Sequence, residues 1–234
     1  MSPLTKSIHG IDSETWKMIV IESARDFGIE VTTNQMAQLI RFAEFLREWN
    51  KKINLTAITD PEEIAIKHFI DSMALLPFLP PETETLLDIG SGGGFPGLVL
   101  AIFRPDLQIT SIDAVRKKIS FQQHIIRTLS LKRVQAFHTR AESLARTNRS
   151  SIADSYNVIV SRALGSLELF VGLGLPLLAP GGTMIAYKGR SIDDEQDEFA
   201  SCIVKSIPLS IDTRTYCLPK YGDRRSLVFI NRNV

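Results

Sequence analysis

The chain has 234 residues, 44% hydrophobic and 23% charged, with a formal net charge of +1 at pH 7. This composition indicates a globular protein with a sizeable core and excludes a disordered or fibrous chain. No apolar run reaches the roughly 20 residues of a membrane span, and the N-terminus lacks the apolar core of a signal peptide. The two cysteines and four histidines do not form a disulfide framework or a metal-ligand pattern. We therefore expect a cytoplasmic protein without metal.

The first part of the chain has the apolar spacing of helices. Ser13 or Asp12 is a candidate cap for a helix that ends near Gly28, and Thr32-Thr33 offers a cap for a second. In the second helix apolar residues recur at helical intervals, namely Met36, Leu39, Ile40, Ala43 and Leu46. A third helix is expected to begin at Pro61, because proline and acidic residues favour a first turn. Prolines at positions 77, 80 and 81 then indicate a linker.

From residue 85 the pattern changes to alternating strands and helices. Five strands are predicted, at Thr85–Ile89, Gln108–Asp113, Val134–His138, Asn157–Ser161 and Thr183–Lys188. Helical stretches separate most of them, notably Arg116–Ser130 and Ser166–Leu178. Two further strands, Asp212–Leu218 and Ser226–Asn231, flank a turn-like segment and are expected to pair as an antiparallel hairpin. We therefore expect an N-terminal helical extension (1–82) and an α/β domain (83–234) with a mostly parallel, Rossmann-like sheet that ends in an antiparallel hairpin.

The most informative segment joins the first strand to a glycine-rich turn, Leu86-Leu87-Asp88-Ile89-Gly90-Ser91-Gly92-Gly93-Gly94-Phe95-Pro96-Gly97. Glycines let the backbone approach a ligand closely, and the free N–H groups at the start of the next helix favour acceptor atoms. In a doubly wound sheet such a turn lies at the carboxyl end of a strand, where ligands bind. Gly92, Gly94 and Gly97 match G-x-G-x-x-G, which alone is weak evidence.

Two acidic residues bear on the ligand of this turn. Asp88 would repel the pyrophosphate of a dinucleotide by roughly 1–4 kcal/mol, whereas it would favour S-adenosylmethionine, which carries an ammonium and a sulfonium. Asp113 ends the next strand, where a carboxylate can accept bonds from both ribose hydroxyls of either cofactor; a helix cap is the alternative. Arg140-Ala141-Glu142, after the third strand, is either an adenine contact or an ordinary surface turn.

Charge is distributed unevenly along the chain. Residues 1–82 contain 8 basic and 12 acidic residues, a net charge of −4, and residues 83–234 contain 19 and 14, a net of +5. Within the second part, residues 116–149 carry nine bases and one acid, an excess large enough to attract a polyanion. A solvated basic face is the alternative. Arg116, Lys117 and Lys118 oppose the dipole of the helix that they begin, which hints at phosphate contact.

Motifs distributed over most of the chain resemble the bacterial small-subunit ribosomal RNA methyltransferase G family, also called glucose-inhibited division protein B. They are Trp49-Asn50, Ile53-Asn54-Leu55-Thr56-Ala57-Ile58, Lys67-His68-Phe69-Ile70-Asp71-Ser72, the glycine turn, Asp113 with Lys117-Lys118, Arg140-Ala141-Glu142, Ser161-Arg162-Ala163 and Lys188-Gly189. The Asn-Leu-Thr and His-Phe-Ile-Asp-Ser pieces distinguish this family among methyltransferases. Departures from its usual pattern are Gly93 for Ala, Leu98-Val99 for Ile-Pro and Ala114 for Ser. None of them removes a charged contact.

The resemblance implies a class I S-adenosylmethionine-dependent methyltransferase that modifies the N7 atom of one guanine in 16S ribosomal RNA. It implies cofactor contacts at Gly90, Phe95, Ala141, Glu142 and Arg162. We add Asp113, because a carboxylate at that strand end can accept the ribose hydroxyls. Catalytic residues stay unassigned. We expect 16S ribosomal RNA, free or in the small subunit, as the partner of a monomeric enzyme, with no membrane and no metal.

Three further positions have open roles. Arg162, at a strand end, is expected either to pair with the cofactor carboxylate or to form a salt bridge with Asp71 or Glu142. Lys188 ends another strand on the expected substrate side. His68 and Asp71 lie three residues apart on one helix face, so they either buttress the site or form a core pair.

Two other functions compete with RNA methylation. An NAD-dependent oxidoreductase is disfavoured by Asp88 and by the terminal hairpin. A non-catalytic RNA-binding protein that responds to the cofactor stays open, because methylation of guanine N7 leaves no acid–base signature in a sequence: N7 has an in-plane lone pair and no proton to lose. The chain shows no convincing acid–base pair.

Overall fold

The computed structural model describes residues 13–147, 156–189 and 209–232. Its centre is a seven-stranded sheet in the order β3-β2-β1-β4-β5-β7-β6. The first five strands of this order are parallel, and β7 runs antiparallel to both β5 and β6. The expected parallel sheet with a terminal antiparallel hairpin is therefore confirmed. The strands are β1 (Thr85–Ile89), β2 (Gln108–Asp113), β3 (Val134–His138), β4 (Tyr156–Arg162), β5 (Leu178–Lys188), β6 (Leu209–Cys217) and β7 (Arg224–Arg232).

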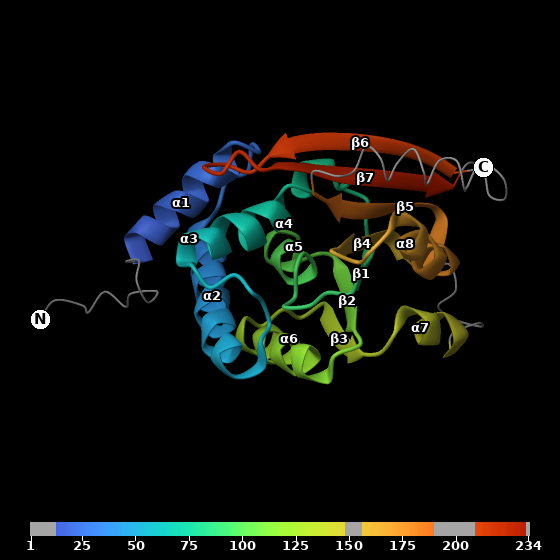
Figure 1. Cartoon of the computed structure of the whole chain (residues 1–234), viewed down its shortest axis with the longest axis horizontal. Coiled ribbons are helices and arrows are strands. Elements are labelled where there is room, and N and C mark those ends of the chain that lie inside the picture. Colours follow the sequence, from blue (N-terminus) through green and yellow to red (C-terminus); the bar gives the residue numbers. More distant parts are fainter. Residues whose placement is uncertain (1–12, 148–155, 190–208, 233–234) are drawn as a thin grey trace, which may run out of the picture.

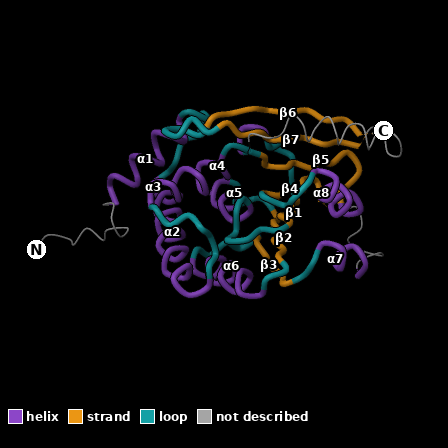
Figure 2. The backbone as a smooth tube through the Cα atoms, viewed as in Figure 1, coloured by secondary structure: helices purple, strands orange, loops and turns teal. Residues whose placement is uncertain are grey.

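Helices pack against both faces of the sheet (Figures 1 and 2). They are α1 (Ser13–Arg25), α2 (Thr33–Ile53), α3 (Pro61–Ile64), α4 (Asp71–Met73), α5 (Gly97–Phe103), α6 (Arg116–Thr128), α7 (Ala141–Thr147) and α8 (Leu167–Gly174). Successive side chains of a strand point to opposite faces, so Leu86 joins the apolar cluster with α1, α2, α5 and α6, whereas Leu87 joins the cluster with α7 and α8. Both faces of the central strands are thus buried, as a parallel sheet requires.

Local signals account for the boundaries of the N-terminal helices. Thr32 and Gln35 form a reciprocal capping box at the start of α2. The carboxylate of Asp60 accepts the amide of Glu63 at 2.9 Å and caps α3. The predicted helix start at Pro61 is confirmed, and α3 then passes into a π-helical segment, Ala65–Ile70, before α4. The carbonyl of Lys67, within this segment, accepts a hydrogen bond from the side chain of Arg162 in β4.

The N-terminal helices share one hydrophobic core with the sheet. Trp16 and Phe42, from α1 and α2, belong to the same buried cluster as Phe121 of α6 and Val158 of β4. Trp16 and Phe42 are fully buried, so burial of this surface is a large part of what holds the helices against the sheet. The division into residues 1–82 and 83–234 stays a prediction.

Strand β5 is longer than its sequence pattern indicates. It begins at Leu178, not at Thr183, and the preceding helix ends at Gly174 before a short 3₁₀ turn. The pairing of β4 with β5 shifts register between Tyr156 and Val158. A Cβ on Gly182 would lie 2.8 Å from the carbonyl oxygen of Asn157, so glycine admits this close strand approach. Two adjacent glycines, Gly181 and Gly182, are typical of a turn, so the sequence pattern does not predict the strand residues that precede Thr183.

Candidate active site

The glycine-rich turn after β1 is held against the end of β2. The amides of Gly90 and Ser91 both donate to the carbonyl of Ile112, at 2.9 and 3.1 Å. Gly90 and Gly92 have φ values of +71° and +56°, in the left-handed region that glycine adopts without strain. The turn therefore lies at the carboxyl end of the strand, where the sequence placed it.

A buried glutamine that the sequence analysis did not single out supports this turn. Gln122 of α6 is fully buried, and its Nε2 donates to Ser91 Oγ at 2.7 Å and to the carbonyl of Gly92 at 2.9 Å. Its signal in the sequence is a polar residue three positions from Ile119 and Ile125, on the inward face of α6. Spacing identifies such a residue as buried, but the partner that it binds is set by the tertiary fold.

The carboxylate of Asp113 connects β2 to the glycine turn. Its Oδ2 accepts the amide of Gly92 at 2.9 Å, and its Oδ1 accepts the amide of Val115 at 2.7 Å. A helix cap was the alternative role, but α6 begins at Arg116 without a side-chain cap. Each carboxylate oxygen offers about two lone-pair directions, so these two bonds leave Asp113 able to accept hydroxyl groups as well.

Asp88 does not lie beside the ligand of the glycine turn, as the choice between the two cofactors from the sequence assumed. Its side chain is fully buried, and Oδ2 accepts the amide of Gly97, at the start of α5, at 2.8 Å. Oδ1 has no hydrogen-bond partner among the described residues. Burial raises the pKa of this carboxyl to about 7, against the opposing effects of the Gly97 amide and the Arg162 charge. Because Asp88 is fully buried and bonded to Gly97, the expectation that its carboxylate faces the ligand is wrong, and Asp88 instead anchors the start of α5 beneath the turn.

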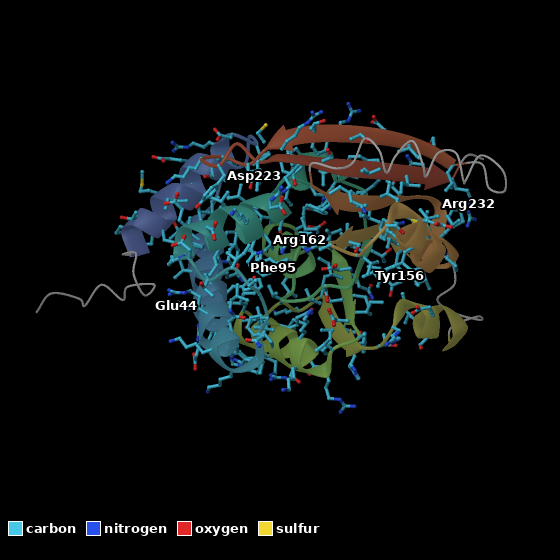
Figure 3. All side chains as sticks on the ribbon, in the orientation of Figure 1. Glu44, Phe95, Tyr156, Arg162, Asp223 and Arg232 are labelled. Atoms are coloured by element: carbon cyan, nitrogen blue, oxygen red, sulfur yellow. The ribbon has the colours of Figure 1, made fainter. Side chains whose placement is uncertain are left out.

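Phe95 lies in the glycine turn, but its ring is buried. The ring stacks on Phe42 of α2 at a centroid distance of 5.0 Å and on His68 at 4.8 Å. The guanidinium of Arg162 lies 5.1 Å from its centroid, and Figure 3 shows both side chains near the centre of the molecule. The ring thus fastens the turn to the N-terminal helices, so a cofactor contact by Phe95 has to come from its backbone.

Arg162, at the end of β4, binds the segment that precedes β1. Its Nη1 donates to the carbonyl of Lys67 at 2.8 Å and to Asp71 Oδ2 at 3.2 Å, and its Nη2 donates to Nδ1 of His68 at 3.1 Å. The hydroxyl of Tyr216, from β6, donates to the other oxygen of Asp71 at 2.7 Å. Of the two salt bridges considered from the sequence, the one with Asp71 is present. The Arg162 side chain keeps 17% of its surface exposed.

The contact with Arg162 determines the tautomer of His68. A guanidinium only donates, so Nδ1 accepts, and the proton resides on Nε2, which lies 2.8 Å from Thr56 Oγ1. Burial, followed by the positive charge of Arg162, lowers the pKa of His68 to about 3. The imidazole is therefore neutral at pH 7. Both His68 and Asp71 hold Arg162, so of their two open roles the structure supports the buttress.

The sheet order brings the expected cofactor residues to one edge. β3, β2, β1 and β4 are adjacent and parallel, so their carboxyl ends lie side by side. The residues at or after these ends are Gly90, Phe95, Asp113, Ala141, Glu142 and Arg162. Ala141 is buried and Glu142 exposed at the start of α7. Between β1 and β4 the strand order reverses, which is where doubly wound sheets bind ligands.

The basic residues of segment 116–149 gather on α6 and around β3. Arg116, Lys117, Arg127, Lys132, Arg133 and Arg140 are exposed, and Lys118 is half-buried. Arg149 lies outside the described residues. Such a group of exposed cations favours a polyanion. Lys188, at the end of β5, donates to the carbonyl of Gly165 at 2.6 Å.

The chemistry of this edge is that of a nucleoside site. Its groups are backbone donors of a glycine turn, a carboxylate with free lone pairs and a partly exposed arginine. Among the described residues, no group of three or more His, Cys, Asp and Glu side chains is placed to hold a metal ion. No helix in the described part of the chain is long and apolar enough to cross a membrane.

Comparisons with known proteins agree with this geometry. A family model described as GidB, rRNA small subunit methyltransferase G, matches residues 35–214. A ribosomal RNA small subunit methyltransferase G of Geobacter sp. (strain M21) is 43% identical over 217 residues, which cover 93% of this chain and 98% of the relative. Another, of Geobacter sulfurreducens, is 44% identical over 212 residues, with coverages of 91% and 95%.

The fold is similar to that of solved methyltransferases. A SAM-dependent methyltransferase from Aquifex aeolicus superposes with a TM-score of 0.54 at 15% identity, over 76% of this chain and 96% of the other. At this identity the likeness concerns the fold alone.

Proposed function

The chain belongs to the rRNA small subunit methyltransferase G family, and from this premise we propose that it transfers the methyl group of S-adenosylmethionine to N7 of one guanine in 16S ribosomal RNA. It is an S-adenosylmethionine-dependent ribosomal RNA methyltransferase. The observation that carries the proposal of guanine N7 as the target is the 43% identity over 93% of the chain to a methyltransferase G. The glycine turn and Asp113, which meet at the switch point of the sheet, support the same conclusion.

The residues at the carboxyl edge fit this cofactor. A Cβ on Gly90 would lie 3.1 Å from Leu164 Cδ1, so a glycine keeps the space beside the turn open. Asp113 is suited to accept the ribose hydroxyls, and Ala141-Glu142 to meet the adenine. We assign the methionine carboxylate to Arg162, which is paired with Asp71 and keeps 17% of its side chain exposed. When bound, the cofactor supplies an electrophilic methyl group.

Phe95 contributes to this site in a different way. Its ring is held between Phe42 and His68, so it fixes the path of the glycine turn, and its backbone is the part available to the methionine end. Gly90 likewise contributes through its backbone. These six cofactor contacts, at Gly90, Phe95, Asp113, Ala141, Glu142 and Arg162, are our proposal for the site.

The reaction at N7 requires no general base. Attack by the N7 lone pair would form the N–CH3 bond as the S–CH3 bond breaks, which would release S-adenosylhomocysteine and leave the positive charge on guanine, with no proton lost. The residues that hold cofactor and guanine would speed this step by aligning the two reactants. Two titratable groups near the site suit this role. His68 has both ring nitrogens engaged and a pKa lowered to about 3. Asp88 is fully buried beneath α5. Both are placed to position the site and not to exchange protons with the substrate.

The exposed bases of segment 116–149 suit a ribosomal RNA substrate. Arg116 and Lys117 are exposed at the start of α6, close to Asp113 in the chain, so we assign them to phosphates of the RNA. We propose that the enzyme acts as a monomer, in the cytoplasm where ribosomes assemble, and binds its RNA through this surface.

The proposal is tested by following the methyl group. The chain is incubated with 16S ribosomal RNA and methyl-labelled S-adenosylmethionine, and the labelled nucleoside is identified after digestion. We expect label in 7-methylguanosine at one position. Label in an exocyclic amine, in a ribose hydroxyl or in no nucleoside at all would refute the N7 proposal. Asp106→Ala, a change at an exposed acid outside the site, is the control and should leave the yield unchanged.

A further inference from the structure

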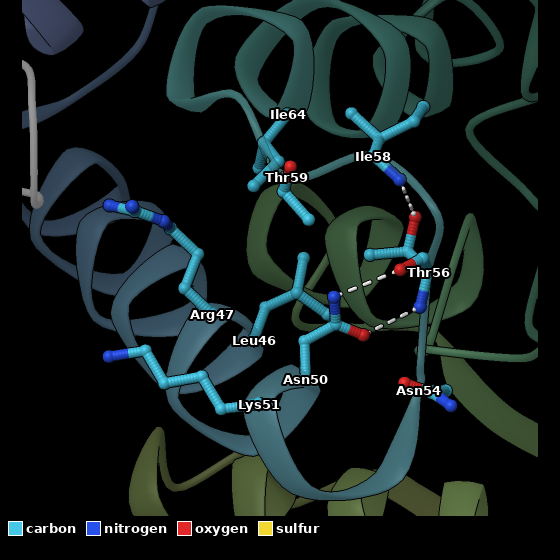
Figure 4. A pocket seen from close by; sticks show the side chains of 9 residues that line it. All are labelled: Leu46, Arg47, Asn50, Lys51, Asn54, Thr56, Ile58, Thr59 and Ile64. Carbon is cyan, nitrogen blue, oxygen red and sulfur yellow. Dashed lines mark hydrogen bonds between the residues drawn. The ribbon is translucent and has the colours of Figure 1, made fainter.

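A cavity lies beside the segment that carries Thr56, whose hydroxyl group bonds His68. It opens between α2 and the loop 54–60, with a volume of about 300 Å³. Figure 4 shows the side chains that surround it. They are Leu46, Arg47, Asn50, Lys51, Asn54, Thr56, Ile58, Thr59 and Ile64. None of them belongs to the cofactor contacts proposed above.

The charged part of this lining is cationic. Arg47 and Lys51 are bases, and the nine lining residues contain no acid. Nη1 of Arg47 is buried, without a hydrogen-bond partner among the described residues. Burial lowers the pKa of Arg47, against the effect of the nearby Asp60 carboxylate, and that carboxylate is engaged in capping α3. A buried donor of a charged group without a partner is costly, and an anion bound beside the Arg47 guanidinium would satisfy it.

The apolar part of the lining forms a floor. Leu46 and Ile64 are buried, and Ile58 is half-buried at the mouth. Aliphatic side chains of this kind accept the face of a planar base, while Asn54 and Thr59 are exposed at the rim and able to hydrogen-bond its edge. The volume is at the lower end of the range for small-molecule sites. It suits one nucleotide and excludes a duplex.

One wall of the cavity is hydrogen-bonded to the residues that hold Arg162. The side-chain amide of Asn50 donates to the carbonyl of Thr56 and accepts its amide, both at 2.9 Å. Thr56 Oγ1 bonds His68, which in turn bonds Arg162 at the end of β4. Preorganised walls of this kind reduce the ordering cost of binding. A strand of RNA that reaches Arg162 therefore has a second, prepared site within a short distance.

We propose that this cavity binds one nucleotide of the substrate RNA other than the methylated guanine, with Arg47 and Lys51 on its phosphate and Leu46 and Ile64 under its base. The inference rests on the proposed function, because RNA is its assumed source. A nucleotide of the RNA and a free mononucleotide are both ribonucleoside phosphates, so either could bind in the cavity by the same contacts.

The first experiment separates the cavity from general charge. Arg47→Gln/Lys51→Gln removes both cavity bases, and Arg41→Gln/Lys52→Gln removes two exposed bases of the same helix that do not line the cavity. Binding of 16S ribosomal RNA is measured by filter retention at several salt concentrations. We expect the cavity variant to bind at least about tenfold more weakly, with a salt slope flatter by about one to two units. The control should stay within twofold of the unaltered chain, and affinity for S-adenosylmethionine should not change in either.

The second experiment fills the cavity with a larger side chain and leaves the charges of Arg47 and Lys51 unchanged. Thr59→Trp should fill the cavity from its rim and weaken RNA binding by a comparable factor. In parallel, uridine 5′-monophosphate and uridine are titrated into labelled protein and followed by NMR. The nucleotide should shift the amides of residues 46–59 in the unaltered chain and not in the Arg47→Gln/Lys51→Gln variant, and uridine should bind more weakly than its phosphate.

Three results would overturn the proposal. Equal weakening by both double variants would assign the effect to general charge. Tight RNA binding by Thr59→Trp would show that the cavity stays empty in the complex. Nucleotide binding in the cavity without any loss of RNA affinity would identify a free nucleotide as the occupant. Because these readouts are binding measurements, a failure of methyl transfer itself would refute the proposed function and leave this test intact.

Discussion

Gly97 offers a direct test of how α5 is packed beneath the glycine turn. Its amide donates to the buried Asp88 carboxylate at 2.8 Å. In Gly97→Ala, the added Cβ would lie 2.7 Å from Asp88 Oδ2 and 3.1 Å from Ser111 Oγ. Both neighbours are fully buried, so neither can move into solvent, and the start of α5 has to shift away from β1.

The magnitude follows from three contributions. Overpacking a core costs about 1–3 kcal/mol, and weakening a hydrogen bond to a carboxylate costs up to about 1.5–3 kcal/mol. Replacing a helical glycine by alanine returns about 1 kcal/mol. We therefore expect Gly97→Ala to lose about 2–4 kcal/mol of unfolding free energy in urea titrations, and to bind S-adenosylmethionine more weakly because the turn above it moves.

Gly172→Ala is the matched control for this prediction. Gly172 lies in α8, and a Cβ there would meet nothing within 4 Å. This variant should gain up to about 1 kcal/mol of stability, because only the helix propensity changes. A Gly97→Ala protein within 0.5 kcal/mol of the unaltered chain, on the scale of a neutral surface substitution, would refute the close packing of α5 on Asp88.

The expected cofactor and RNA contacts and the two buried titratable groups each allow a further test. Asp113→Ala should weaken S-adenosylmethionine binding in calorimetry, by one or two charge-assisted hydrogen bonds of roughly 1.5–3 kcal/mol each. Lys117→Ala/Lys118→Ala should flatten the logarithmic salt slope of RNA binding by about one to two units and leave cofactor affinity unchanged. The pKa of Asp88, raised to about 7, means that the folded state binds more protons than the unfolded state between about pH 4 and 7, so its contribution to stability falls as pH rises through this window. Asp88→Asn should abolish that fall, which is at most about 4 kcal/mol. His68, whose pKa is lowered to about 3, contributes in the opposite sense and loses stability as pH falls below about 6.5.

Each of these changes has a comparison within the chain. Asp106→Ala removes an exposed acid and should leave cofactor affinity unchanged, so equal losses in both variants would exclude Asp113 from the site. Arg25→Ala/Lys52→Ala removes two exposed bases of the N-terminal helices. An equal effect of that variant on the salt slope would place Lys117 and Lys118 on an ordinary solvated face. A pH profile of unfolding that is identical in the unaltered chain and in Asp88→Asn would contradict the burial of Asp88.

The sequence predicts the architecture well because its signals are local. Three strands, β1, β2 and β3, have the predicted boundaries, since each is a short segment with buried apolar residues that ends at a glycine, an acid or a turn. Prediction fails where a tertiary contact determines the backbone. The extra residues of β5 depend on the close approach of Gly182 to Asn157, and the π-helical segment Ala65–Ile70 lies where Arg162 binds the carbonyl of Lys67.

The site was predicted in part for the same reason. Strand order brings residues at strand ends together, so the chain positions of Asp113 and Arg162 predict that both lie at the carboxyl edge of the sheet, where the structure has them. The direction in which a side chain points is not encoded locally. Asp88 follows the rule for an acid beside a glycine turn, yet it points into the core toward Gly97. Gln122 has an inward helical position, but only the fold shows that it binds the glycine turn.

The central claim is methyl transfer to guanine N7 without a general base, and its most direct test is a single-turnover measurement. Saturating enzyme, methyl-labelled cofactor and 16S ribosomal RNA are mixed at pH values from 6.5 to 8.5, and the rate of label appearing in 7-methylguanosine is recorded. We expect a nearly constant rate across this range, because N7 has no proton to lose and His68 stays neutral. A tenfold rise with pH that disappears in a His68→Gln variant with unchanged cofactor affinity would contradict it and identify His68 as the base.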